Sequence, residues 1–258
     1  VERSRGLGDV YKRQALTAAI AFDALGKGRV KTIMMPFDFT ADISIEDAGS
    51  LAKNLGIEHS EISIKEMYES FSLALKESFE GMGIDKTEEN LQSRCRGVTL
   101  MALSNKLGFL VLTTGNKSEA AVGYSTLYGD TAGGFSVLKD VSKTLVYELA
   151  NYRNSLSVVI PKRIIERPPS AELAPDQKDT DSLPDYDRLD PIIEMYVEDD
   201  KSIQEIINEG FDEKEVRRIV SLIDFNEYKR RQAPLGIKIS DRNFGKDRRY
   251  PITNSWKP

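Results

Sequence analysis

A short apolar run that ends abruptly in a polar turn constrains the fold of this chain most. Residues 109–112 (FLVL) are uninterruptedly apolar, as in a strand buried on both faces of a parallel sheet. Residues 113–119 (TTGNKSE) are small or polar, and Asn116 or Ser118 is suited to begin a helix. In open α/β sheets, ligands lie beyond such strand ends, where helix amides face anions. The stretch predicts a nucleotide and a metal ion, although an ordinary capped helix explains it equally well.

Strands and helices alternate over the first half of the sequence, which predicts an α/β fold with a doubly wound parallel sheet. Strands are predicted at 30–35, 57–64 and 109–113, and helices at 15–26, 43–55, 65–79 and 88–105. Prolines then break up a polar stretch, so 166–187 is predicted to be a long loop, either disordered or a lid over substrate. Helical patterns return at 189–198, 202–209 and 212–225, before a basic, irregular tail from 228.

The composition excludes several classes of protein. The net charge of -5 argues against a nonspecific grip on nucleic acid as the main activity. No apolar run approaches the roughly 18 residues that indicate a membrane span. The single Cys95 cannot form an internal disulfide, which favours a cytoplasmic setting. With one cysteine and one histidine, the usual kind of zinc site is nearly excluded, and we interpret Cys95 and His59 as packed residues.

The first residues do not follow the pattern of the rest. Residues 1–14 (VERSRGLGDVYKRQ) carry no periodicity, and a helix opens directly after them without a preceding strand or cap. Residues 9–14 back-translate in one frame to GATGTGTATAAGAGACAG, a transposon-type sequencing adapter. We hypothesise that 1–14 is a non-native segment on a gene fragment, to be set aside from the fold. A disordered basic tail is the alternative.

Several other polar residues are candidates for ligand binding, although none of them alone indicates a site. Asp130 lies in a turn flanked by glycines, and Asn90 and Arg94 share one face of a predicted helix. Lys139 and Lys143 lie at the predicted start of another helix, where a cation is unfavourable unless it serves a phosphate or a developing negative charge. For each group the plain alternative is a surface turn or a solvated helix face.

Taken together, several segments resemble NAD synthetase, the adenylating, amide-forming enzyme of the ATP-pyrophosphatase superfamily. These segments are 15–26, 88–108, 110–130, 133–154, 168–190 and 229–256, so the resemblance covers nearly everything after residue 14. The last segment resembles the glutamine-dependent branch, whose synthetase domain follows a nitrilase-type glutaminase domain. The resemblance implies an adenine-nucleotide α-hydrolase-like domain over 15–190, with the helices and basic tail of 191–258 packed on it. It also implies that the chain is truncated at its N-terminus.

The resemblance implies a reaction in two steps. The carboxylate of deamido-NAD (nicotinic acid adenine dinucleotide) attacks the α-phosphate of ATP and releases pyrophosphate. Ammonia, which the full-length protein takes from glutamine, then displaces AMP and leaves the amide of NAD. Magnesium relieves the repulsion between the two anionic substrates. A cytoplasmic homodimer or higher oligomer is expected, with 88–107 and 142–152 as candidate faces and with no nucleic-acid or membrane partner.

The resemblance also assigns roles by matching position. Glu119 and Ser170 correspond to magnesium-side residues, and Lys143 to the lysine that faces the phosphates. Lys143 and Asp130 are the expected catalytic residues, and Asp130 also resembles a group that binds deamido-NAD. The expected nucleotide-binding residues are Thr114, Asn90, Arg94, Lys117, Lys139 and Asp179, the last within a mobile loop. We rank Glu119, Asp130 and Lys143 highest.

Two departures from the family matter. One is that Phe37, Asp38 and Phe39 follow Pro36, where many relatives carry a basic residue near the adenine. The other concerns phosphate binding. The family's phosphate-binding turn, Ser-Gly-Gly-x-Asp-Ser, should stand directly before Ala15, but positions 9–14 hold DVYKRQ. Val10 and Tyr11 cannot replace glycines that let backbone amides close on pyrophosphate. We therefore expect little or no activity from this polypeptide, and an active product from the intact gene. Two alternatives stay open: another adenylating amidotransferase, such as a GMP-synthetase-like enzyme, and a non-catalytic module that binds nucleotide or dimerises.

Overall fold

The computed structural model describes residues 12–167, 172–174 and 184–253. The strands are β1 (Lys31–Met34), β2 (Glu58–Glu61), β3 (Leu112–Thr113), β4 (Phe135–Ser136) and β5 (Leu235–Gly236). The helices of the first half are α1 (Lys12–Leu25), α2 (Asp42–Leu55), α3 (Lys65–Leu75), α4 (Lys86–Leu107) and α5 (Lys117–Val122). The later helices are α6 (Lys143–Leu156), α7 (Lys162–Glu166), α8 (Tyr186–Ile193), α9 (Ile203–Asn208), α10 (Glu213–Phe225) and α11 (Glu227–Arg230). A π-helical turn, Glu194–Glu198, continues α8.

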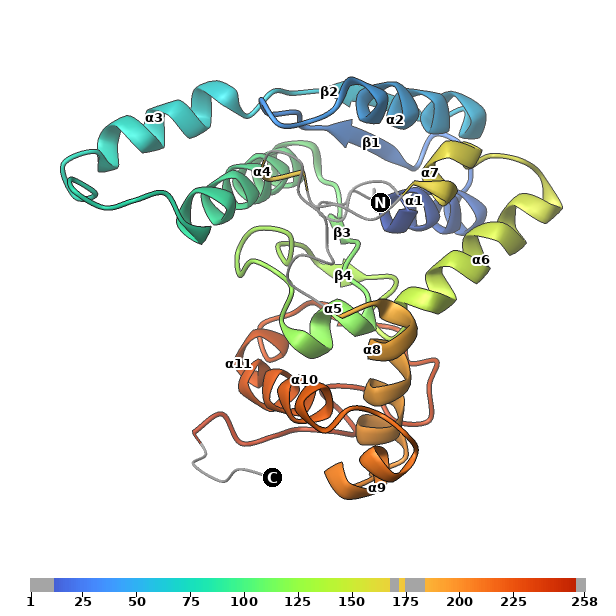
Figure 1. Ribbon diagram of the computed structural model, residues 1–258. Coiled ribbons are helices and arrows are strands. Elements are labelled where there is room, and N and C mark those ends of the chain that lie inside the picture. Colours follow the sequence, from blue (N-terminus) through green and yellow to red (C-terminus); the bar gives the residue numbers. More distant parts are fainter. Residues whose placement is uncertain (1–11, 168–171, 175–183, 254–258) are drawn as a thin grey trace.

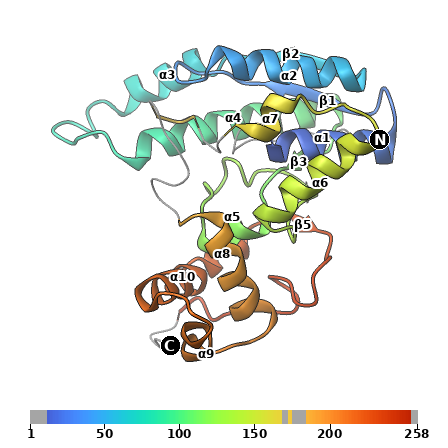
Figure 2. The ribbon, with the colours of Figure 1, turned by 45° about the vertical axis from the view of Figure 1, so that its right-hand side comes forward.

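The described strands pair in parallel, which confirms the predicted α/β fold. β1 pairs with β2, and β3, β4 and β5 follow one another in a second sheet. β1 lies between α2 and α1 in both ribbon views (Figures 1 and 2). The tail was predicted to be irregular, but it contributes β5. Two residues are too few to show the alternation that marks a strand, and β5 exists through its pairing with β4.

Two of the four groups of buried apolar residues in the described part of the chain are much larger than the others. The first gathers residues of α1 and α2 with β-strand neighbours, and includes Ala19, Leu51 and Leu112. The second gathers α5 with α8, α9 and α10, and includes Val122 and Ile223. Helix α5 thus lies between the sheet and the C-terminal helices, at the centre of Figure 1. The side chains of α5 are therefore positioned by contacts with the sheet on one side and with the C-terminal helices on the other.

Most predicted helix ends are confirmed. Gly56 and Gly108 end α2 and α4 in the left-handed conformation, at φ of 64° and 67°. The predicted helices at 189–198, 202–209 and 212–225 are present as α8 with its π-helical turn, α9 and α10. The predicted start of α6 is wrong. Ser142 accepts a hydrogen bond from Leu145 N–H, so α6 begins at Lys143 and Lys139 lies before the helix.

The start of α1 also differs from the prediction. Its first turn contains Lys12 and Arg13, from the segment that we set aside, and both are buried. The expected packing of Cys95 is confirmed, since its side chain is buried on α4. No helix in the described part of the chain combines the length and the apolar character that a membrane crossing requires.

Candidate active site

The turn from β3 into α5 is organised by Asn116. Its Oδ1 accepts the N–H of Glu119 at 2.9 Å, and its own N–H donates to Glu119 Oε2 at 3.4 Å. This reciprocal pair satisfies two amides of a helix start, so of the two predicted caps, Asn116 and Ser118, Asn116 is the one that begins α5. Thr114 is buried just before it. The cap fixes Glu119 on the first turn of α5, beyond the carboxyl end of β3.

Lys143 meets Glu119 from the start of α6. Its Nζ lies 3.3 Å from Glu119 Oε1, and the two side chains are 0% and 2% exposed. The backbone N–H of Lys143 donates to Ser118 Oγ at 2.8 Å, and its ammonium lies 4.9 Å from the centre of the Tyr186 ring. A cation opposes the helix dipole at this position. The Glu119 carboxylate offsets that cost. Two of the three residues that the sequence analysis ranked highest, Glu119 and Lys143, are therefore in contact.

Arg13 is a third member of this cluster that the sequence did not suggest. Its Nη1 donates to Glu119 Oε2, and to the Thr114 carbonyl oxygen at 3.3 Å. Sequence reasoning missed Arg13 because residues 1–14 were interpreted as a non-native segment. Both carboxylate oxygens of Glu119 therefore face a buried cation of this chain.

The α4 face predicted to bind deamido-NAD meets the turn at 126–131. Thr126 Oγ1 donates to Asn90 Oδ1 at 2.7 Å, and Arg94 Nε donates to the Leu127 carbonyl at 3.3 Å. The N–H of Asp130 donates to Ser93 Oγ, one residue before Arg94, at 3.1 Å. Asn90, Arg94 and Asp130 are thus brought together. Their role in binding deamido-NAD stays a prediction.

Two glycines permit the close approach of this turn to α4. A Cβ on Gly97 would lie 2.6 Å from the Tyr128 carbonyl oxygen, and one on Gly129 would lie 2.3 Å from Ser93 Oγ. Tyr128 itself has a φ of 63°, in the left-handed region that few non-glycine residues adopt. The surrounding contacts therefore specify the conformation that carries Asp130.

Burial and charge act in opposite directions on Asp130. Desolvation raises the pKa of its carboxyl group, while the hydrogen bond from Thr126 N–H, at 2.6 Å, and the charges of Arg13 and Lys229 lower it. The net direction is upward. Arg13 acts on Asp130 as well as on Glu119, so its charge links the turn at 126–131 to the α5–α6 cluster.

The Lys117 side chain belongs to a different network from that of Glu119 and Lys143. Its ammonium lies 2.9 Å from Asp140 Oδ1, 2.6 Å from Glu198 Oε1 and 2.7 Å from Ser240 Oγ. Burial alone would raise the pKa of Asp140, but hydrogen bonds from Ser240, Lys117 and Ile239 outweigh it and lower that pKa. This network fastens the C-terminal segment to α5. It does not favour the predicted nucleotide-binding role of Lys117.

The remaining predicted residues divide into two groups. Lys139 donates to the Pro234 carbonyl, and burial lowers the pKa of its ammonium, so it secures the strand at 235–236 instead of beginning a helix. Ser170 and Asp179 lie outside the described residues. Within the predicted lid, Glu172 is buried and accepts hydrogen bonds from Ser44 Oγ at 2.9 Å and Ala41 N–H at 3.3 Å. This residue ties the lid segment to the start of α2.

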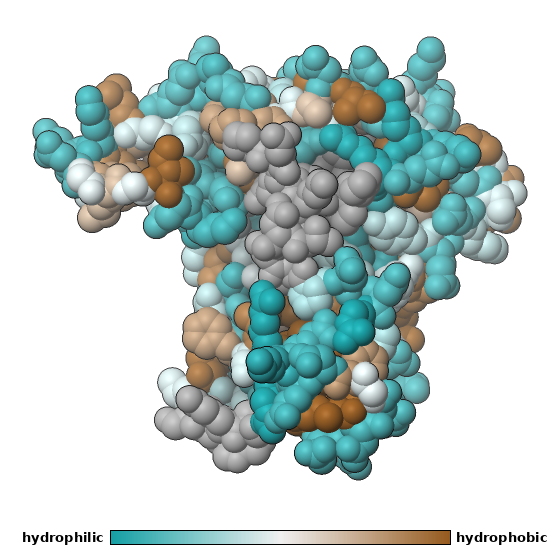
Figure 3. All heavy atoms as spheres, in the orientation of Figure 1, coloured by the Kyte–Doolittle hydropathy of each residue, from teal (hydrophilic) through white to brown (hydrophobic). Residues whose placement is uncertain are grey.

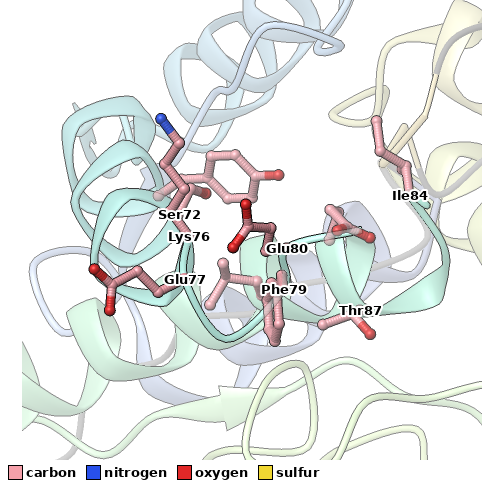
Figure 4. Close-up of a pocket in the computed structure, with 10 residues that line it drawn as sticks. Ser72, Lys76, Glu77, Phe79, Glu80, Ile84 and Thr87 are labelled. Atoms are coloured by element: carbon pink, nitrogen blue, oxygen red, sulfur yellow. The ribbon is translucent and has the colours of Figure 1, made fainter. Parts of the chain in front are cut away.

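Three cavities bear on where a ligand could bind, and one of about 380 Å³ is lined by Lys117, Ser118 and Asp140. A second, of about 50 Å³, lies among residues of α1, α2 and β1 and is also lined by Thr114. Small-molecule sites usually measure about 300 to 1,000 Å³, so a nucleotide there requires rearrangement. The third, of about 720 Å³, lies between α3 and α4, where Figure 4 shows Lys76, Glu80 and Thr87 around it. It contains none of the predicted site residues. The surface over α3 and α4, at the upper left of Figure 3, carries both hydrophobic and hydrophilic residues.

The described residues do not fit a magnesium site as they stand. Glu119 presents both of its oxygens to cations of the chain, Arg13 and Lys143. No group of three or more histidine, cysteine, aspartate or glutamate side chains within the described ranges is arranged to hold a metal. Magnesium prefers carboxylate and water oxygens that are free to coordinate it. The predicted metal role of Glu119 is therefore not supported by this arrangement, and that of Ser170 cannot be placed.

The parallel sheet, the capped helix after β3 and the charged groups at its carboxyl edge define a parallel α/β protein, in which ligands usually bind beyond the carboxyl ends of the strands. The family described as NAD synthase matches residues 13–233, and the chain belongs to that family.

Individual relatives agree with this placement. A glutamine-dependent NAD(+) synthetase of Acinetobacter baylyi is 56% identical over 246 residues, which are 95% of this chain and 46% of that protein. A solved glutamine-dependent NAD+ synthetase of Acinetobacter baumannii, in complex with ADP, has a TM-score of 0.63 at 49% identity, covering 99% of this chain and 46% of the other. A solved NMN synthetase of Francisella tularensis has a TM-score of 0.73 at 28% identity, covering 88% and 86%. The chain thus spans less than half the length of the glutamine-dependent relatives.

Proposed function

We propose that the protein of which this chain is a part converts deamido-NAD to NAD at the expense of ATP. A carboxylate oxygen of deamido-NAD attacks the α-phosphorus of ATP, and the bond to pyrophosphate breaks. Ammonia then attacks the carbonyl carbon of this acyl adenylate, and AMP leaves with the bonding electron pair. The attacking nitrogen loses one proton to the surroundings, and the amide of NAD remains.

The convergence of Glu119 and Lys143 beyond β3 is the observation that carries this proposal. Both substrates are anions at the point of attack, so a cation positioned there is required to hold them together. We assign this task to the Lys143 ammonium, which Glu119 fixes in direction. Asn90, Arg94 and Asp130 form the adjacent surface for the dinucleotide, and Thr114 lies against ATP. Both carboxylate oxygens of Glu119 are paired with Arg13 and Lys143, so Glu119 as it stands has no oxygen to offer a magnesium ion.

The nitrogen is proposed to come from glutamine. The Acinetobacter relatives are named glutamine-dependent, and this chain covers 46% of each of them. A nitrilase-type glutaminase domain in the full-length protein would supply ammonia to the site. The chain as written is proposed to be nearly inactive, because Val10 and Tyr11 stand where the family has the glycines of its phosphate turn.

We propose that the protein forms a homodimer in which α4 lies at the interface. Val98, Met101 and Leu107 of this helix expose apolar side chains, as does Leu156 at the end of α6. Exposed apolar groups on one helix are a basis for association. Light scattering of the purified chain, compared with a V98E/L107E variant, tests it: the first should give a dimer and the second a monomer.

A panel of acids tests the assigned substrate. In the chain with residues 9–14 replaced by Ser-Gly-Gly-Val-Asp-Ser, exchange of labelled pyrophosphate into ATP is measured with deamido-NAD, nicotinic acid mononucleotide or xanthosine monophosphate. Only deamido-NAD should support exchange. The similarity to an NMN synthetase makes the mononucleotide the specific competitor, and exchange with it alone would replace the proposed substrate. Binding of deamido-NAD without exchange would favour a non-catalytic module.

A further inference from the structure

The carboxylate of Asp190 on α8 joins the first turn of α5 to the first turn of α6. Its Oδ1 accepts a hydrogen bond from the Ser118 hydroxyl. Its Oδ2 accepts the N–H of Thr144 at 2.8 Å and the Oγ1 hydroxyl of the same residue at 2.9 Å. Asp190 is only 7% exposed, and a buried carboxylate needs such donors. It therefore links two helix starts that lie far from it along the chain.

The first three amides of α6 each donate to a side chain. The three bonds run from Lys143 to Ser118 Oγ, from Thr144 to Asp190 Oδ2 and from Leu145 to Ser142 Oγ, at 2.8, 2.8 and 3.3 Å. These amides have no partner within their own helix, and a carboxylate near them is favoured by the helix dipole. Because Ser118 also donates to Asp190, one hydroxyl connects the Lys143 amide to that carboxylate. The backbone that carries the Lys143 side chain is thus fixed.

Helix α8 also contacts the other end of Lys143. Tyr186 lies four residues before Asp190, so the two side chains share a face of α8. The Tyr186 ring centre lies 4.9 Å from the Lys143 ammonium. The neighbouring Leu189 and Ile192 pack into the apolar group that contains α9 and α10. A helix anchored in this way gives Lys143 a firm support at its backbone and beside its charge.

We infer that Asp190 is a positioning residue, which fixes the start of α6 through Ser118 and Thr144 so that the Lys143 ammonium is directed at the reacting phosphate. The inference rests on the proposed function, because it needs Lys143 to act on the bound anions. Displacement of a reacting group by about 1 Å can cost about 100-fold in rate. The loss of Asp190 should therefore lower kcat and leave the KM values for ATP and deamido-NAD nearly unchanged.

Pyrophosphate exchange tests the inference in the chain that carries Ser-Gly-Gly-Val-Asp-Ser at 9–14. The variants are D190N, S118A, K143A and K143A/D190N, and circular dichroism must show each of them folded at the assay temperature. D187N is the matched control, because Asp187 is an exposed carboxylate on the same helix. D190N should lower kcat by about 10- to 100-fold and change either KM by less than about twofold. S118A should lower kcat as well, and D187N should match the parent.

The double variant separates positioning from a merely structural role. If Asp190 acts through Lys143, the D190N change should cost less than about twofold once Lys143 is already alanine. A structural role would lower the unfolding temperature of D190N without changing kcat of the folded enzyme. Hydrogen exchange at the Lys143 amide, followed by NMR in the 258-residue chain, needs no activity. This exchange should be faster in D190N than in D187N.

Three results would overturn the inference: an unchanged kcat in D190N, a loss in K143A/D190N that multiplies the two single losses, or unchanged exchange at the Lys143 amide. If D190N does not fold, S118A decides, because it breaks the same chain of hydrogen bonds from the α5 side. Failure of the proposed function is distinguishable, since the parent chain itself would then show no exchange with deamido-NAD. In that case hydrogen exchange still decides whether Asp190 fixes Lys143.

Discussion

The Nζ atom of Lys143 lies 3.3 Å from Oε1 of Glu119, and neither side chain reaches solvent. The pair joins the first turn of α5 to the first turn of α6, at the carboxyl edge of β3. Because both groups are buried, removing one of them would leave an uncompensated charge in the interior, which costs more free energy than breaking an exposed pair. This relationship makes the pair a determinant of stability as well as a candidate for chemistry.

Removing one partner should therefore be costly. K143M leaves Glu119 with only Arg13 as a described cationic partner, and the free energy of unfolding should fall by about 3 to 5 kcal/mol. Urea denaturation followed by circular dichroism measures it. K162M, which breaks an exposed pair with Glu166, is the control and should cost less than about 1 kcal/mol. Equal losses in the two variants would mean that the Lys143 pair contributes no more than a surface pair.

The approach of the 126–131 turn to α4 should not tolerate a methyl group. In G97A the new Cβ would meet the Tyr128 carbonyl oxygen at 2.6 Å, so the chain should lose about 1 to 3 kcal/mol of stability. G49A is the matched control, because Gly49 is also helical and a Cβ there meets nothing within 4 Å. That change should be neutral or stabilise by up to about 1 kcal/mol. Thermal unfolding compares them, and a neutral G97A would contradict the close approach.

Because of Asp140, the free energy of unfolding should decrease as the pH falls into the acidic range. Its pKa is lowered in the folded chain, so its contribution is complete above the unfolded pKa of about 3.9 and is lost as pH falls through the folded pKa. D140N removes the contribution. Urea unfolding at several pH values should show D140N much less stable than the parent near neutral pH, and the gap should close in strong acid. A gap that stays constant down to pH of about 2 would contradict the role of this carboxylate.

Asp130 should show the opposite dependence. Its pKa is raised in the folded chain, chiefly by burial, so the ionised carboxylate costs stability and the cost appears as pH rises through the folded pKa. D130N keeps an oxygen acceptor for Thr126 N–H without the charge. It should be more stable than the parent at neutral pH and equal to it in acid, as unfolding curves at both pH values would show. A D130N chain that is less stable at neutral pH would mean that its charge stabilises the fold.

Local signals predicted much of the fold but less of the site. Asn116 and Gly108 act through neighbouring amides and carbonyls, so the sequence suffices to place the helix ends that they make. Lys117 pairs with Asp140, Glu198 and Ser240, whose distances along the chain leave no pattern to read. β5 depends on β4 for its existence. Arg13 was missed for another reason: it belongs to a segment that was set aside because it lacks periodicity and back-translates to a sequencing adapter, although α1 begins within it.

Pyrophosphate exchange in a pair of chains tests the central claim most directly. Both carry Ser-Gly-Gly-Val-Asp-Ser at 9–14, and one also carries K143A. The account predicts exchange of labelled pyrophosphate into ATP that requires deamido-NAD, and a loss of about 100-fold or more in the K143A chain, by analogy with the removal of one anion-stabilising donor. Circular dichroism must show both chains folded. Exchange that proceeds without deamido-NAD, or at an unchanged rate in the K143A chain, would contradict the account.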